Sequence, residues 1–292
     1  MKISQVPVPL CEAGESPVWD VADQALYYID MLEQKVFRWD PETGELRHWE
    51  LPDKVGSMSL RGKGSRPDGA IVALFSGVYS LDFTTGEVMP VAPFDPPNPN
   101  IQCADGKVDR AGRFIFGTSH RQAAEPVGGL FSLSPDGSVT QLDDGIILGN
   151  GPCWSPDNKT LYHSDSLRHQ IYAYDYDLET GTVANRREFF NSSEYGPIPD
   201  GATIDADGNM WVAICQGGVV LCLTPQGKVE RVIDFPTRIP ASCMFGGPDL
   251  DRLYVPTLSP AFMGHPTIPL DGATFVIEGL GVKGLPEPRF GG

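Results

Sequence analysis

Short apolar runs separated by turn residues recur along the whole chain. Each run is followed by a second strand-like stretch and then by a glycine-containing turn, as in the succession ALYYID, KVFRWD and PETGE. Such units are typical of β-hairpins. The six runs begin about 45 residues apart, an interval typical of repeat folds, and they occupy residues 25–30, 70–75, 113–118, 160–165, 209–214 and 252–257.

The regular interval predicts the fold class. Six repeats of this length, each with several short strands, indicate an all-β protein with the fold of a six-bladed β-propeller whose blades are four-stranded. A β-sandwich would not require so regular an interval over most of the chain. We therefore expect one propeller domain over residues 1–292, and we expect the N-terminal segment ISQVPVP to supply the strand that closes the ring with the last blade.

Composition and charge narrow the possible partners. Hydrophobic residues make up 41% of the 292 residues, which is enough for a large core. A net charge of −16 disfavours binding to nucleic acid and to anionic membrane surfaces. No run of 18 apolar residues and no apolar leader is present, so we expect neither a membrane span nor export, and a cytoplasmic location. The six cysteines form no C-x-x-C pair and are expected to be free thiols. Monomer and small homo-oligomer both stay open.

The first strand of each blade lines the central channel of a propeller, and its first residues lie near the channel mouth. The matching positions upstream of the runs are Glu15, Ala104, Asn150, Asp200, Ser242 and, in the second blade, Gly56 or Ser57. Two carboxylates and an amide at one level around a channel suit a hard divalent cation. The alternative is that these side chains cap strand ends by bonding backbone amides. The residues alone leave both interpretations open.

Several motifs resemble those of the gluconolactonase, regucalcin (senescence marker protein) and luciferin-regenerating enzyme family. They include GESPVW, NGPCWSPD, PDGATIDADGNMWVA and FGGPDLDRLYV, and the resemblance covers nearly the whole chain. It implies a six-bladed propeller and hydrolysis of small lactones, often aldonolactones. It also implies that Glu15, Asn150 and Asp200 hold one divalent metal ion (Ca²⁺, Mg²⁺, Zn²⁺ or Mn²⁺), with Asp200 as the general base. Asp205 and Asp207, in the same segment as Asp200, are expected to be turn residues.

The third blade departs from the family pattern. Members commonly have arginine and asparagine facing the sugar where this chain has Gln102 and Ala104, and a glutamate where it has Gln122. A pocket without these groups would accept a less hydroxylated lactone. His120 and Arg121 lie beside Gln122, and either they replace the missing substrate contacts or they belong to a solvated loop.

The function that the sequence favours is metal-dependent opening of a sugar-type or less hydroxylated lactone. No G-x-S-x-G or H-E-x-x-H motif points to a serine hydrolase or a zincin. Two alternatives stay open: a metal-binding propeller that serves as a regulatory module without activity, and a metal-dependent hydrolase or isomerase of another small ester. The segment 259–273 is expected to overhang the channel as a lid, with Phe262, Met263 and His265 as candidate contacts.

Overall fold

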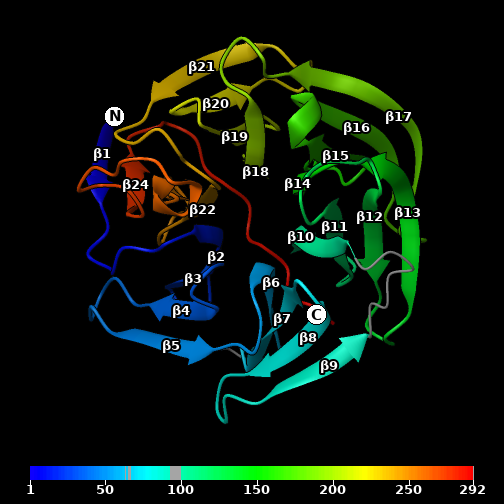
Figure 1. Ribbon diagram of the computed structural model, residues 1–292, viewed down its shortest axis with the longest axis horizontal. Coiled ribbons are helices and arrows are strands. Elements are labelled where there is room, and N and C mark those ends of the chain that lie inside the picture. Colours follow the sequence, from blue (N-terminus) through cyan, green and yellow to red (C-terminus); the bar gives the residue numbers. More distant parts are fainter. Residues whose placement is uncertain (63, 65–66, 93–99, 292) are drawn as a thin grey trace.

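The computed structural model describes residues 1–62, 64, 67–92 and 100–291. Their strands form six four-stranded antiparallel sheets that stand around a central axis (Figure 1). The predicted all-β class and the predicted number of blades are therefore confirmed. The described part contains two short 3-10 turns, η1 (Ser166–Arg168) and η2 (Pro260–Met263), and no α-helix. None of its helical segments is long and apolar enough to cross a membrane.

Each blade runs from an innermost strand at the axis to an outermost strand at the rim. The innermost strands are β2 (Gly14–Asp20), β6 (Val55–Arg61), β10 (Ile101–Val108), β14 (Gly149–Trp154), β18 (Ile198–Ile204) and β22 (Met244–Gly246). The second strands coincide within two residues with the six apolar runs; they are β3 (Ala25–Asp30), β7 (Gly69–Leu74), β11 (Phe114–His120), β15 (Thr160–Asp165), β19 (Met210–Cys215) and β23 (Arg252–Pro256). The third strands are β4 (Lys35–Trp39), β8 (Gly77–Asp82), β12 (Gly128–Leu133), β16 (Gln170–Asp177), β20 (Val219–Leu223) and β24 (Thr274–Glu278). The outermost strands are β5 (Leu46–Glu50), β9 (Val88–Ala92), β13 (Val139–Ile146), β17 (Thr182–Asn191), β21 (Val229–Asp234) and β1 (Lys2–Gln5).

The sixth blade joins the two ends of the chain. Its strand order is β22, β23, β24 and β1, and β1 pairs antiparallel with β24 from Lys2 opposite Glu278 to Gln5 opposite Phe275. The expectation that the N-terminal segment closes the ring is thereby confirmed. Closure in this way leaves no blade with a missing strand.

The middle strands of the blades are covered on both faces. All six residues of β3 and all six of β19 are buried, whereas most of β17 is exposed. Neighbouring blades pack through large side chains; Trp19 of the first blade stacks on Tyr254 of the sixth with ring centroids 5.5 Å apart. A strand that is buried on both faces favours an apolar residue at every position. This is why the sequence shows continuous apolar runs rather than alternation.

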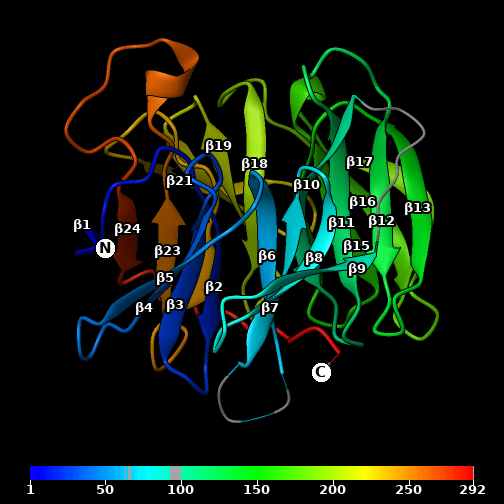
Figure 2. The same ribbon diagram turned by 60° about the horizontal axis from the view of Figure 1, so that its bottom comes forward.

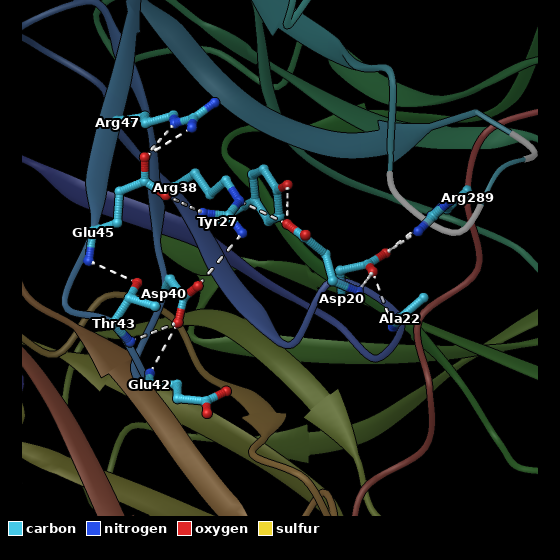
Figure 3. Close-up of polar contacts among 11 residues, drawn as sticks. Asp20, Ala22, Tyr27, Arg38, Asp40, Glu42, Thr43, Glu45, Arg47 and Arg289 are labelled. Atoms are coloured by element: carbon cyan, nitrogen blue, oxygen red, sulfur yellow. Dashed lines mark hydrogen bonds and ion pairs between the residues drawn. The ribbon is translucent and has the colours of Figure 1, made fainter.

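The C-terminal segment 279–291 crosses the end of the ring where the innermost strands finish (Figure 2). The backbone N–H of Phe290 donates to the carbonyl of Leu60 in the second blade at 2.8 Å. Arg289 pairs with Asp20 of the first blade, with Nη2 and Oδ2 2.6 Å apart (Figure 3). This segment therefore ties blades together at one end of the axis, opposite to the end where the candidate site residues lie.

The segment 259–273, between β23 and β24, does not lie where the sequence suggested. Figure 2 shows it (orange) rising above the sixth blade, to one side of the axis, so it does not overhang the channel. Met263 turns towards the mouth and packs on an apolar cluster that includes Cys215 and Leu258. His265 is exposed, and the side chain of Phe262 lies outside the described residues.

Candidate metal and substrate site

A β-bulge interrupts five of the innermost strands at equivalent places. The register shifts lie between Glu15 and Val18, Val55 and Ser57, Cys103 and Gly106, Asn150 and Cys153, and Pro199 and Ala202. A bulge leaves a residue out of the ladder and re-aims its side chain. The bulges contain or adjoin the positions aligned from the sequence, and in the second blade they select Gly56 over Ser57.

Glycines in the bulges let neighbouring innermost strands come into contact. Gly151 has a φ of +59°, and a Cβ on it would lie 2.7 Å from the carbonyl oxygen of Asp200. A Cβ on Gly201 would lie 2.0 Å from the Oγ of Ser242 in the sixth blade. The glycine that follows Asp200 is thus required by packing between blades, in addition to any turn preference of Asp-Gly.

Two buried carboxylates, of Asp105 and Asp200, and the half-buried carboxylate of Glu15 lie near the start of the innermost strands. Burial is the main cause that raises the pKa of Glu15 well above its usual value, and the charges of Asp200 and Asp105 raise it further. Burial and then Asp105 raise the pKa of Asp200 in the same way. Burial also raises the pKa of Asp105, against the opposing charge of buried Lys107. Three carboxylates and one ammonium leave a charge of −2 when all are ionised, which a divalent cation would neutralise.

Asp105 is the carboxylate that the sequence reasoning missed. Its Oδ1 accepts from the N–H of Gly106 at 2.7 Å and its Oδ2 accepts from the N–H of Gly151 at 2.9 Å. Through these bonds Asp105 holds the third blade against the fourth, beside Asn150. The signal that could have revealed it is the shared Asp-Gly pair, since Asp105 precedes its glycine as Asp200 does.

Asn150, Glu15 and Asp200 each have a hydrogen-bond partner that holds the side chain in place. The Nδ2 of Asn150 donates to the Oγ of Ser166 at 3.0 Å, and that hydroxyl donates to the carbonyl of Pro199 at 2.6 Å. This chain of bonds fixes the orientation of the amide, so that Oδ1 is the atom that would bind a cation. Glu15 accepts one bond, from the N–H of Ser16 to Oε2 at 3.0 Å. Asp200 accepts a hydrogen bond from the neutral thiol of Cys215.

These groups fit an oxygen-bound divalent cation. Carboxylate and amide oxygens are the ligands that hard cations prefer. Among the described residues, no group of three or more His, Cys, Asp or Glu side chains is arranged to hold a metal ion. A cation held here by Glu15 and Asp200 would take its further ligands from other residue types or from water, and the amide of Asn150 supplies one candidate oxygen.

Asp205 and Asp207 show how the same segment uses aspartate differently. The carboxylate of Asp205 is fully buried and accepts bonds from the backbone of Asp207 and Asn209 and from the indole of Trp211. Asp207 is exposed in that turn. Asp205 is a structural turn residue, as expected, whereas Asp200 lies in a bulge of an innermost strand.

The predicted substrate residues of the third blade lie on the same end of the ring as Glu15. Gln102, half-buried, and Ala104, which is 8% exposed, belong to β10, and Gln102 pairs with Ser119 of β11. Their side chains offer neither positive nor negative charge to a ligand. The mouth is accordingly less polar here than the family pattern would make it.

The turn after β11 contains the other predicted substrate residues. His120 is buried, and its Nδ1 accepts from the N–H of Gln122 at 3.2 Å, so the imidazole caps this turn. Arg121 and Gln122 are exposed. The guanidinium of Arg121 donates to the carbonyl of Phe75 in the second blade at 3.4 Å. Of the three, Arg121 and Gln122 have side chains accessible to a ligand at the mouth.

The chain is similar to characterised proteins over its whole length. Residues 13–259 match the family model described as the SMP-30/Gluconolactonase/LRE-like region. Regucalcin of Xenopus laevis is 37% identical, over 100% of this chain and 99% of that protein. A solved luciferin-regenerating enzyme superposes with a TM-score of 0.90 at 27% identity, covering 99% of both chains. A solved calcium-binding regucalcin from Agrobacterium tumefaciens gives a TM-score of 0.87 at 25% identity, covering 97% of this chain and 95% of that one. The chain belongs to the SMP-30/gluconolactonase/luciferin-regenerating enzyme family.

Proposed function

We propose that the protein is a divalent-metal-dependent lactonase that opens small cyclic esters. The observation that carries the proposal is the pair of interacting carboxylates Glu15 and Asp200, beside an oriented Asn150 amide, in a chain whose family includes gluconolactonases. The buried charge of −2 supports a divalent rather than a monovalent ion. The six free cysteines support a reducing, cytoplasmic location.

In this proposal Glu15, Asn150 and Asp200 hold the cation, which when bound supplies polarisation of the ester carbonyl. Asp200 accepts the proton of the water that attacks the carbonyl carbon. As the ring C–O bond breaks, the proton passes to the leaving oxygen and a hydroxy acid is released. Cys215 and the N–H of Gly201 donate to Asp200 and keep its carboxylate in place.

The substrate is proposed to be a neutral lactone with few hydroxyl groups. Gln102, Ala104 and Gln122 support this, because they offer substrate hydroxyls no charged hydrogen-bond partner and leave fewer directed hydrogen bonds at the mouth. Arg121 could contact a substrate oxygen from the β11–β12 turn. A sugar lactone is the less favoured substrate within the same activity.

The test is acid release from sugar, aliphatic and aromatic lactones, followed in a pH-stat. The protein is first treated with a chelator, and Ca²⁺, Mg²⁺, Zn²⁺ and Mn²⁺ are then added singly. We expect hydrolysis that depends on a metal and that Asp200→Asn reduces by at least about a hundredfold. Asp207→Asn, which removes an exposed carboxylate of the same segment, is the matched control and should retain the rate. Normal turnover in Asp200→Asn would defeat the assignment.

A calcium-binding module without activity is the second candidate. It is favoured by one observation, the likeness to an Agrobacterium protein described as calcium-binding. The same measurements separate the two. Tight binding of Ca²⁺ with no acid release from any lactone would support the module, and metal-dependent release would support the enzyme.

A further inference from the structure

A cavity of about 670 Å³ lies between the segment 259–273 and the connections of the fifth and sixth blades. Its lining combines apolar side chains with the charged residues Asp234, Arg238 and Asp271. Phe235 is fixed there by edge-on packing against Phe275, with ring centroids 5.1 Å apart. Its lining includes Gln216, Phe235, Ile239, Met263, His265 and Ile268. The volume lies within the range of small-molecule sites.

The cavity is joined to the candidate catalytic site by shared residues. Ile239 and Met263 line the cavity and also belong to the apolar cluster at the channel mouth. That cluster contains Cys215, whose thiol donates to Asp200, and Ile198, which lies two residues before it. Apolar packing through Ile198, Ile239 and Met263 therefore connects the surroundings of Asp200 with the wall of the cavity.

We propose that this cavity binds an apolar substituent of the substrate, so that the preferred lactones carry an alkyl chain on the ring. The inference rests on the proposed lactonase function. With the ester carbonyl beside Asp200, the chain lies along Ile198 and Met263 and enters the cavity below the segment 259–273. The flexible thioether of Met263, half-buried and in contact with the amide of Gln216 at 4.0 Å, adapts to chains of different length. The apolar wall thus takes the place of the polyol contacts that Gln102 and Ala104 do not provide.

The experiment measures kcat/KM for a series from γ-butyrolactone to γ-lactones with two, four and six additional carbons in the chain. Each methylene that leaves water for the cavity should raise kcat/KM about fourfold until the cavity is filled. Met263→Gln keeps the length of the side chain and makes it polar. It should reduce kcat/KM about tenfold for the longest lactone and less than about twofold for γ-butyrolactone.

Leu10→Gln is the matched control. Leu10 is 53% exposed and lines a separate cavity of about 800 Å³ on the first-blade side of the same segment. This variant should leave the whole series unchanged, and thermal unfolding should confirm that both variants are folded.

The outcomes separate the inference about the alkyl chain from the proposed lactonase function on which it rests. Equal kcat/KM along the series, or a loss in Met263→Gln that is the same for every lactone, would overturn the inference and leave the lactonase assignment intact. Absence of hydrolysis for every lactone with every metal would overturn both.

Discussion

Lowering the pH from 7 to 4 should reduce the free energy of unfolding through a single buried histidine. His163, in β15, is packed between the third and fourth blades. A Cβ on Gly117 would lie 3.0 Å from its Nε2, and a Cβ on Gly149 would lie 2.9 Å from it. Neither ring nitrogen has a hydrogen-bond partner among the described residues. Burial, as the main cause, lowers the pKa of His163 from 6.5 to about 4.

The lowered pKa sets the direction and the size of the effect. Between pH 6.5 and 4 the unfolded chain binds the proton at this residue and the folded chain does not, so acid favours unfolding. The fall in pKa corresponds to about 3 kcal/mol of stability, since one pH unit is worth about 1.4 kcal/mol. The loss is absent above pH 6.5, grows as the pH falls, and is complete near pH 4.

The assay is urea unfolding of chelator-treated protein at several pH values between 4 and 7. Other titrating groups are common to all variants, so the comparison with His163→Gln isolates this histidine. The difference in stability between wild type and His163→Gln should move by about 3 kcal/mol in favour of the variant on going from pH 7 to pH 4. His48→Gln removes an exposed histidine of β5 and should follow the wild type. Parallel curves for wild type and His163→Gln would refute the reasoning.

Two further predictions concern contacts between blades. Arg289→Ala should lower the free energy of unfolding by about 1–3 kcal/mol, because it removes a mostly buried ion pair with Asp20 and leaves that carboxylate without its partner. The control is Lys283→Ala, which removes an exposed ion pair of the same C-terminal segment. It should change the free energy of unfolding by less than about 0.5 kcal/mol. Equal melting temperatures for these two variants would contradict the role given to the segment. Gly201→Ala should lower the free energy of unfolding by about 1–3 kcal/mol, because the added methyl group overpacks against Ser242. The same variant should also hydrolyse lactones more slowly. Wild-type stability in denaturation and a wild-type rate of hydrolysis would contradict this prediction.

The blades could be predicted because their signal is local. In β3 and β19 burial on both faces produces a nearly continuous apolar run, which only Asp30 at the end of β3 departs from, and the turns between strands contain glycine at regular intervals. Glu15, Asn150 and Asp200 could be aligned to within one residue because repeats of one architecture place a bulge at equivalent positions. Glu15 and Asn150 occupy the same ladder position, and Asp200 lies one residue further on, inside the bulge. These features depend on residues within one repeat, which a sequence displays directly.

The contacts that complete the site could not be read in this way. Asp105 bonds the backbone of Gly151, and Ser166 joins Asn150 to the strand that contains Asp200, so each contact connects different blades or strands. Such partners are separated by many residues and are chosen by the closure of the ring rather than by local pattern. The prediction that the segment 259–273 overhangs the channel was wrong for the same reason. The segment is held by distant partners, since the N–H of Ser259 donates to the carbonyl of Glu12 and the N–H of Cys11 donates to the carbonyl of Gly272.

The most direct test of the account is a calorimetric titration of the chelator-treated protein with Ca²⁺, repeated with Zn²⁺ and Mn²⁺. For at least one of these ions we expect one site per chain in the wild type and in Asp207→Asn, and loss of that site in Glu15→Gln and in Asp200→Asn. Both of the latter variants should unfold at a higher temperature than metal-free wild type at pH 7, because each removes a buried charge that its neighbours repel. Undiminished binding of that ion by Glu15→Gln and Asp200→Asn would contradict the proposed metal centre.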